Sequence, residues 1–175
     1  MPESEVEEYM KALKRRQMYL ILENVYDTYN IGGLFRLADA LAVRKIYLCG
    51  EMEIPPNGRI AKASIGTYKV VPWEYRKTAL EAIAELKERE PGISILAVEQ
   101  DDHSLPYTEA RYNAPIAIIV GNETFGVTPE TCEAADSIVE IPMWGINKSL
   151  NVIVSAAIVG YWAASCHPRE GGDPE

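Results

Sequence analysis

Short apolar runs that alternate with helical patterns are the feature that most constrains how this 175-residue chain can fold. An apolar run bounded by turn residues is typical of a buried strand, and apolar residues recurring every three or four positions are typical of a helix. The strands are expected at residues 18–22, 45–48, 68–71, 93–98, 116–120 and 137–141, and the main helices at 31–42, 76–89 and 149–164. This alternation predicts an α/β domain with a mainly parallel sheet and helices on both faces.

The length favours a single domain, expected to span residues 18–165. Residues 1–17 are expected to form a short helical extension that carries basic side chains. The last residues, 166–175, are rich in proline and glycine and predict a disordered tail. No apolar stretch is long enough for a membrane span and no signal peptide is visible, so we expect a cytoplasmic protein. Three cysteines without CxxC spacing and only two histidines argue against a metal site.

The net charge of −9 argues against a protein that binds nucleic acid over its whole surface. A local basic patch remains possible, and scattered solvated charges are the alternative. The candidates for such a patch are Lys11, Lys14, Arg15, Arg16, Arg36, Arg44, Lys45, Arg59, Lys62 and Lys69.

Three polar segments each follow an expected strand, where open parallel sheets bind their ligands. The first, residues 30–39, places Gly32 and Gly33 at the start of a helix and Arg36 further along it. A guanidinium there suits a phosphate, although an ion pair with Asp39 three residues later would also explain it.

The second segment, residues 116–126, is a buried strand that ends in glycine, an amide, a carboxylate and a further glycine. Backbone amides left bare by glycine could receive a polar ligand, and an ordinary strand-to-turn connection is the alternative. The third segment, residues 141–151, is an irregular exit from a strand. Ser149 could cap the following helix, whereas Asn151 within the first turn is harder to explain structurally.

Together, in this order and spacing, the three segments resemble the signature blocks of the SpoU/TrmH-type enzymes of the SPOUT methyltransferase superfamily. The resemblance covers roughly residues 19–162. It implies an α/β fold whose C-terminal part forms a deep trefoil knot, and a homodimer with the active site at its interface. It also implies transfer of a methyl group from S-adenosylmethionine to a ribose 2′-hydroxyl of tRNA or rRNA.

The resemblance carries residue roles to matching positions. It implies that the catalytic set consists of Asn30, Arg36, Glu123, Ser149 and Asn151. It implies that the cofactor lies in the knot against Val98, Gly121, Ile141, Met143 and Leu150. Arg36 would either hold a phosphate or act as the base. The phosphate role is favoured because arginine is effectively always protonated.

Two other functions stay open for the sequence. A non-catalytic RNA-binding or scaffold protein on the same fold would suit the acidic charge. A base methyltransferase acting on guanine would use the same cofactor. The set of Asn30, Arg36, Ser149 and Asn151 favours ribose over the base.

Overall fold

A single seven-stranded parallel sheet forms the centre of the computed structural model, which describes residues 2–167. The strands lie in the order β3-β2-β1-β6-β4-β7-β5, and each neighbouring pair is parallel. Their bounds are β1 Arg16–Glu23, β2 Val43–Cys49, β3 Trp73–Arg76, β4 Ser94–Val98, β5 Leu105–Pro106, β6 Ile116–Val120 and β7 Ser137–Glu140. The predicted α/β class with a parallel sheet is confirmed.

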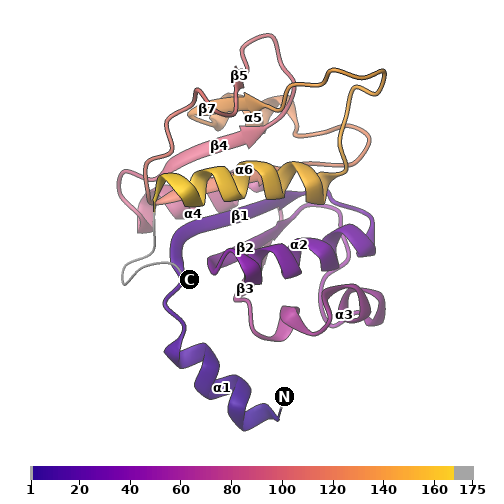
Figure 1. Ribbon diagram of the computed structural model, residues 1–175, viewed down its shortest axis with the longest axis vertical. Coiled ribbons are helices and arrows are strands. Elements are labelled where there is room, and N and C mark those ends of the chain that lie inside the picture. Colours follow the sequence, from indigo (N-terminus) through magenta and orange to yellow (C-terminus); the bar gives the residue numbers. More distant parts are fainter. Residues whose placement is uncertain (1, 168–175) are drawn as a thin grey trace.

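Helices cover both faces of the sheet (Figure 1). The helices are α1 Glu3–Ala12, α2 Thr28–Ala40, α3 Gly58–Ser64, α4 Ala79–Arg89, α5 Pro129–Ala134 and α6 Val152–Cys166, with a 3-10 turn, η1, at Thr67–Lys69. Helices α2, α3 and α6 pack on one face, and α4 and α5 on the other. Helix α1 buries no residue, so it stands apart from this core.

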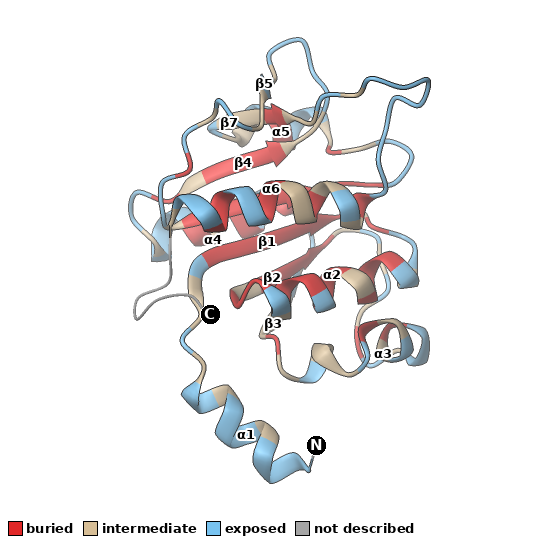
Figure 2. Cartoon of the chain, viewed as in Figure 1, coloured by how far each residue is buried: buried red, intermediate tan, exposed pale blue. Residues whose placement is uncertain are grey.

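Alternating side chains of the central strands separate the core into two layers. In β1, Leu20 and Leu22 join the layer under α2 and α6, whereas Tyr19 and Ile21 join the layer under α4. Strands β1, β6 and β4 are buried over most of their length (Figure 2). A strand covered on both faces needs apolar residues throughout, which explains the continuous apolar runs in the sequence.

The predicted strand at residues 68–71 is wrong. This segment contains the 3-10 turn η1, and the strand that pairs with β2 begins later, at Trp73. Tyr68 and Val70 still pack against the core, from a turn that follows a glycine with φ of 81°. A short apolar run shows that a segment is buried without showing which backbone conformation buries it.

Two helices also begin later than predicted. The helix expected from residue 76 begins at Ala79 behind the N-cap Thr78, and its Leu80 is exposed. Within this helix Glu85 forms an ion pair with Arg89 at 3.0 Å. The helix expected from residue 149 begins at Val152, and Ser149 is therefore not its cap.

The strand order brings distant loops to one edge of the sheet. Strands β1, β6, β4 and β7 are neighbours and parallel, so the loops that follow all four lie at the same edge. This is where an open parallel sheet binds ligands.

Across the described residues, no helix has the length and apolar character required to cross a membrane. Most of the predicted tail, residues 168–175, lies outside the described residues.

Candidate functional site

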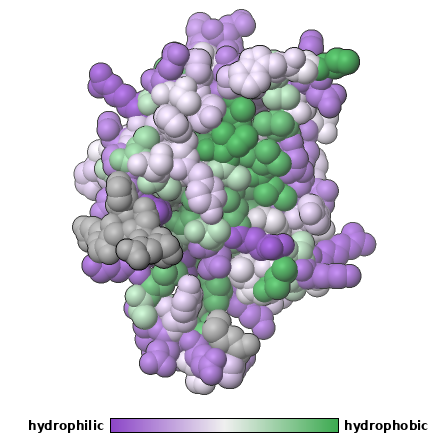
Figure 3. Space-filling model, in the orientation of Figure 1, coloured by the Kyte–Doolittle hydropathy of each residue, from purple (hydrophilic) through white to green (hydrophobic). Residues whose placement is uncertain are grey.

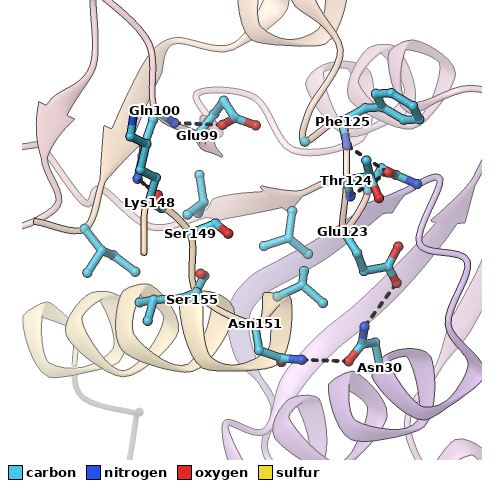
Figure 4. A pocket seen from close by; sticks show the side chains of 18 of the residues that line it. Asn30, Glu99, Gln100, Glu123, Thr124, Phe125, Lys148, Ser149, Asn151 and Ser155 are labelled. Atoms are coloured by element: carbon cyan, nitrogen blue, oxygen red, sulfur yellow. Dashed lines mark hydrogen bonds between the residues drawn. The ribbon is translucent and has the colours of Figure 1, made fainter. Parts of the chain in front are cut away.

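A cavity of about 770 Å³ lies at the carboxyl ends of β4, β6 and β7, between the first turns of α2 and α6. Figure 4 shows Gln100, Lys148 and Ser149 on one side of it and Glu123, Thr124 and Phe125 on the other. Its volume falls in the range of about 300–1,000 Å³ that is usual for small-molecule and cofactor sites.

A chain of hydrogen bonds forms one wall of the cavity (Figure 4). The Nδ2 of Asn30 donates to Oε1 of Glu123 at 3.1 Å, and Nδ2 of Asn151 donates to Oδ1 of Asn30 at 3.0 Å. The Oδ1 of Asn151 in turn accepts from the backbone N–H of Ile153 at 2.8 Å. The chain thus links the loop after β6 to α2 and then to the start of α6.

The two ends of this chain fix the orientation of both amides. An ionised carboxylate only accepts hydrogen bonds and a backbone N–H only donates. Asn30 must therefore turn its NH₂ toward Glu123, and Asn151 must turn its carbonyl toward Ile153. In each of the two side-chain amides, one N–H takes no part in this series of hydrogen bonds. Asn30 is buried, whereas Asn151 is exposed and lines the cavity.

Asn151 is the N-cap of α6, since its backbone is non-helical and its side chain accepts from the second helical residue. The hypothesis that it lies within the first turn is therefore wrong. Capping accounts for its Oδ1 only, because Nδ2 points to Asn30 on another helix.

Glu123 is held as a carboxylate. It also accepts from the backbone N–H groups of Tyr26 at 3.2 Å and Asp27 at 3.0 Å. Burial opposes its ionisation, but the hydrogen bonds from Asn30 and from the backbone amides of Glu123, Asp27 and Tyr26 outweigh burial. The pKa of Glu123 is lowered from its ordinary value of 4.5. Both oxygens are occupied by donors, so this group positions α2.

Residues 121–126 make a tight turn that forms the adjoining wall. Asn122 and Gly126 exchange backbone hydrogen bonds of 3.0 and 2.9 Å, and Oδ1 of Asn122 accepts from the amides of Thr124 and Phe125. A Cβ on Gly121 would lie 2.3 Å from the backbone of Gly126 and Val127, so only glycine fits there. Gly121 thus serves the close approach of the chain to itself.

Contacts that the sequence did not suggest hold the opposite wall. The Nε2 of Gln100 donates to the carbonyl of Lys148 at 2.5 Å, which ties the loop before α6 to the end of β4. Glu99 accepts from the N–H of Val127 at 2.9 Å and links β4 to the turn after β6. Their only signal in the sequence was their position directly after a predicted strand.

The structure brings together most of the residues that the sequence singled out. Apart from Arg36, every one of them lines this cavity: Asn30, Glu123, Ser149, Asn151, Val98, Gly121, Ile141, Met143 and Leu150. Arg36 is exposed on α2 and does not line the cavity. The alternative of an ion pair with Asp39 is also wrong among the described residues, since no such pair forms.

Large apolar side chains are exposed around the cavity and along α6. Phe125, Trp144 and Ile146 are 83%, 93% and 99% exposed. On α6, Val154 is 44% and Tyr161 is 53% exposed. Figure 3 shows hydrophobic surface gathered in the region of α6. A helix that is apolar on its outer face as well as its inner face indicates a further contact surface.

Comparison with known proteins gives consistent results. The family model described as "SpoU rRNA Methylase family" matches residues 17–161. The tRNA (guanosine(18)-2′-O)-methyltransferase of Escherichia coli K12 is 31% identical over 157 residues, which cover 88% of this chain and 66% of that enzyme, just under two thirds of its length.

Solved structures resemble the whole fold. The crystal structure of the Aquifex aeolicus TrmH/SpoU tRNA modifying enzyme has a TM-score of 0.80 and 29% identity, covering 93% of this chain and 82% of that one. The AdoMet-bound rRNA methyltransferase from Sinorhizobium meliloti has a TM-score of 0.79 and 25% identity, covering 90% of this chain and 60% of that one.

Proposed function

This chain belongs to the SpoU rRNA methylase family, and we propose that it transfers a methyl group from S-adenosylmethionine to a ribose 2′-hydroxyl of tRNA or rRNA. One observation carries the proposal. The hydrogen-bond chain from Glu123 through Asn30 to Asn151 forms the wall of a cavity of cofactor size.

The cofactor fits the cavity by volume and by lining. Val98, Ile141 and Leu150 offer apolar walls, Gly121 lets the turn after β6 close against itself beside the cavity, and Met143 lies on the same loop as Ile141. Backbone and apolar surfaces suit an adenosine, and the structurally similar rRNA methyltransferase from Sinorhizobium meliloti has been solved with AdoMet bound. When bound, S-adenosylmethionine supplies an electrophilic methyl group on a positively charged sulfur.

The chain's own contribution is to position the ribose. Asn151 has an N–H that its partners leave unused, and Ser149 lies on the same stretch of the cavity wall. We assign both to orienting the sugar, with Glu123 and Asn30 acting through Asn151. Holding two reactants in line supplies on the order of 7–11 kcal/mol of the barrier, more than any other contribution expected here.

Arg36 is assigned to the RNA backbone. Its guanidinium is exposed, and none of the described residues pairs with it. It lies six positions after Asn30, a rise of about 9 Å along α2. A phosphate of the bound strand can lie at that distance from the target ribose, whereas a base must touch the hydroxyl it deprotonates.

We propose that the C-terminal segment, with β7, the loop after it and α6, forms a trefoil knot. Strand β7 lies beyond β4, yet α6 returns to pack against β6 and α2. The connecting loop must therefore cross back past the turn after β6, which lines the same cavity. Such threading is rare among folds. It would give the cofactor a rigid pocket built from crossing loops.

We also propose a homodimer that works in the cytoplasm. Its interface would include the outer face of α6, where Val154 and Tyr161 are exposed. The domain would span residues 18–165, with α1 within a separate N-terminal extension.

The test is methyl transfer from tritiated S-adenosylmethionine to tRNA and rRNA taken from a strain that lacks the gene. Label should enter one RNA class, and mass spectrometry of the digested product should locate the methyl group on a ribose. A methyl group on guanine would indicate the base methyltransferase. Absence of label with cofactor binding intact by calorimetry would exclude the enzymatic function.

A further inference from the structure

The cations of this acidic chain differ in whether the fold engages them. Arg44, Lys45, Arg76 and Arg89 all form ion pairs with glutamates of β3, α4 or the end of α4, and Arg15 donates to the carbonyls of Val43 and Val70. These cations are committed to the fold. By contrast, Arg36, Arg59, Lys62 and Lys69 are exposed and form no side-chain hydrogen bond or ion pair with any described residue.

These four cations share one packed unit, whereas other exposed cations, Lys11, Lys14, Lys77, Lys87, Arg111 and Lys148, lie outside it. The four lie on α2, α3 and η1, which contact one another. Gly32 of α2 meets Ala63 of α3 so closely that a Cβ on Gly32 would lie 2.4 Å from that of Ala63. Residues four apart on a helix lie on the same face. Arg36 and Arg59 are each four residues from this contact, so both emerge beside the α2–α3 junction.

We infer that Arg36, Arg59, Lys62 and Lys69 form one phosphate-binding strip that carries the RNA strand away from the methylation site. The inference rests on the proposed function. It deepens that function by naming the surface that holds the substrate.

Charge and position both favour an RNA backbone as the occupant. A chain of net charge −9 repels a polyanion in general, so it needs a surface where cations are not neutralised by its own carboxylates. The strip begins on α2, the helix whose first turns carry Asn30 into the cavity wall. A strand anchored along it would thus lead directly to the reacting ribose.

The strip contains four of the ten cations that the sequence offered as candidates for a basic patch. Lys11 and Lys14 are exposed but lie outside α2, α3 and η1. Of those candidates, Arg15, Arg44 and Lys45 are engaged in the fold, and Arg16 donates to the carbonyl of His167 at 2.8 Å. What separates the strip from these residues is the lack of intramolecular partners.

The test compares two double variants that remove the same charge. Arg59→Ala with Lys62→Ala alters the strip. Lys77→Ala with Lys87→Ala removes two exposed cations at and before α4, on the other face of the sheet. Anisotropy with labelled bulk tRNA and with rRNA fragments would give the Kd over a range of salt. Calorimetry would give cofactor affinity.

The strip variant should weaken RNA binding at least tenfold and raise KM with little change in kcat. Its salt dependence should fall by about 1 to 2 in log–log slope, because each lost phosphate contact removes about 0.7 to 0.9. Cofactor affinity and dimer mass should stay as in the unaltered chain. Equal effects in both double variants, or loss of the dimer in the strip variant alone, would overturn the inference. If the unaltered chain transfers no methyl group at all, the proposed function fails instead.

Discussion

The side-chain amide of Asn151 donates to Oδ1 of Asn30 across 3.0 Å, joining the starts of two helices whose residues lie 121 positions apart. Glu123 holds the other side of Asn30, so one carboxylate sets the orientation of two amides. The proposed catalytic geometry therefore depends on residues that need not touch the substrate.

Replacing Asn30 with alanine should affect both stability and turnover. The variant loses a hydrogen bond to a carboxylate, worth about 1.5–3 kcal/mol, and releases Asn151 to rotate. Urea unfolding should register the loss of stability, and kcat should fall more than cofactor affinity. Thr124→Ala is the matched control, because Thr124 lines the cavity but uses only its backbone N–H in the turn. Unchanged kcat in Asn30→Ala would contradict the positioning role.

Glu123 should make stability depend on pH. Its folded pKa lies below the ordinary 4.5, so its stabilising effect is present above that value and is lost as the pH falls through the folded pKa. Urea unfolding of Glu123→Gln and of the unaltered chain should therefore differ most near pH 7 and converge in acid. A difference that grows as the pH falls would show that the carboxylate is not stabilised by its donors.

Gly121→Ala should disrupt the cofactor cavity. The added Cβ would meet rigid backbone at 2.3 Å, so the turn after β6 must move. We expect affinity for S-adenosylmethionine to fall at least tenfold by calorimetry, as about 1.4 kcal/mol of strain would suffice. Gly58→Ala is the control, since a Cβ there meets nothing within 4 Å. If the two variants bind the cofactor equally well, the turn does not shape the pocket.

Arg36→Ala should lower kcat/KM for RNA by about 10- to 100-fold, the value of one charge-assisted contact. Cofactor affinity should stay the same, because Arg36 lies outside the cavity. Arg36→Lys distinguishes a role as phosphate anchor from a role as the base that deprotonates the hydroxyl. A phosphate anchor should keep part of its activity with lysine, which also binds phosphate. A steep new pH dependence in Arg36→Lys would instead favour the role of base.

Val154→Lys should dissociate the proposed dimer. Burying a lysine in an apolar interface is costly unless it finds a partner. Sedimentation at micromolar concentration should show a monomer. Leu80→Lys provides the comparison, because Leu80 is similarly exposed, at 42% against 44%, but lies on α4 over the other face of the sheet. A dimer that persists in Val154→Lys would exclude this face of α6.

The sequence by itself determined the parts that depend on neighbouring residues. Apolar runs located the buried strands near residues 18–22, 93–98 and 116–120, and their alternation with helices specified a parallel α/β sheet. Where burial did not decide the backbone conformation, as at residues 68–71, the sequence predicted a strand and the chain forms a 3-10 turn.

Tertiary structure alone decided how the polar residues of the site act. The N-cap role of Asn151 is local, but its bond to Asn30 was not visible in the sequence. Glu123 likewise accepts from donors at residues 26–30, more than 90 positions earlier. Arg36 resembled a cavity residue in the sequence but lies outside the cavity, because its place around α2 is set by the packing of that helix on α3 and α6. Hydrogen-bond partners so far apart along the chain are specified by strand order, which no local pattern encodes.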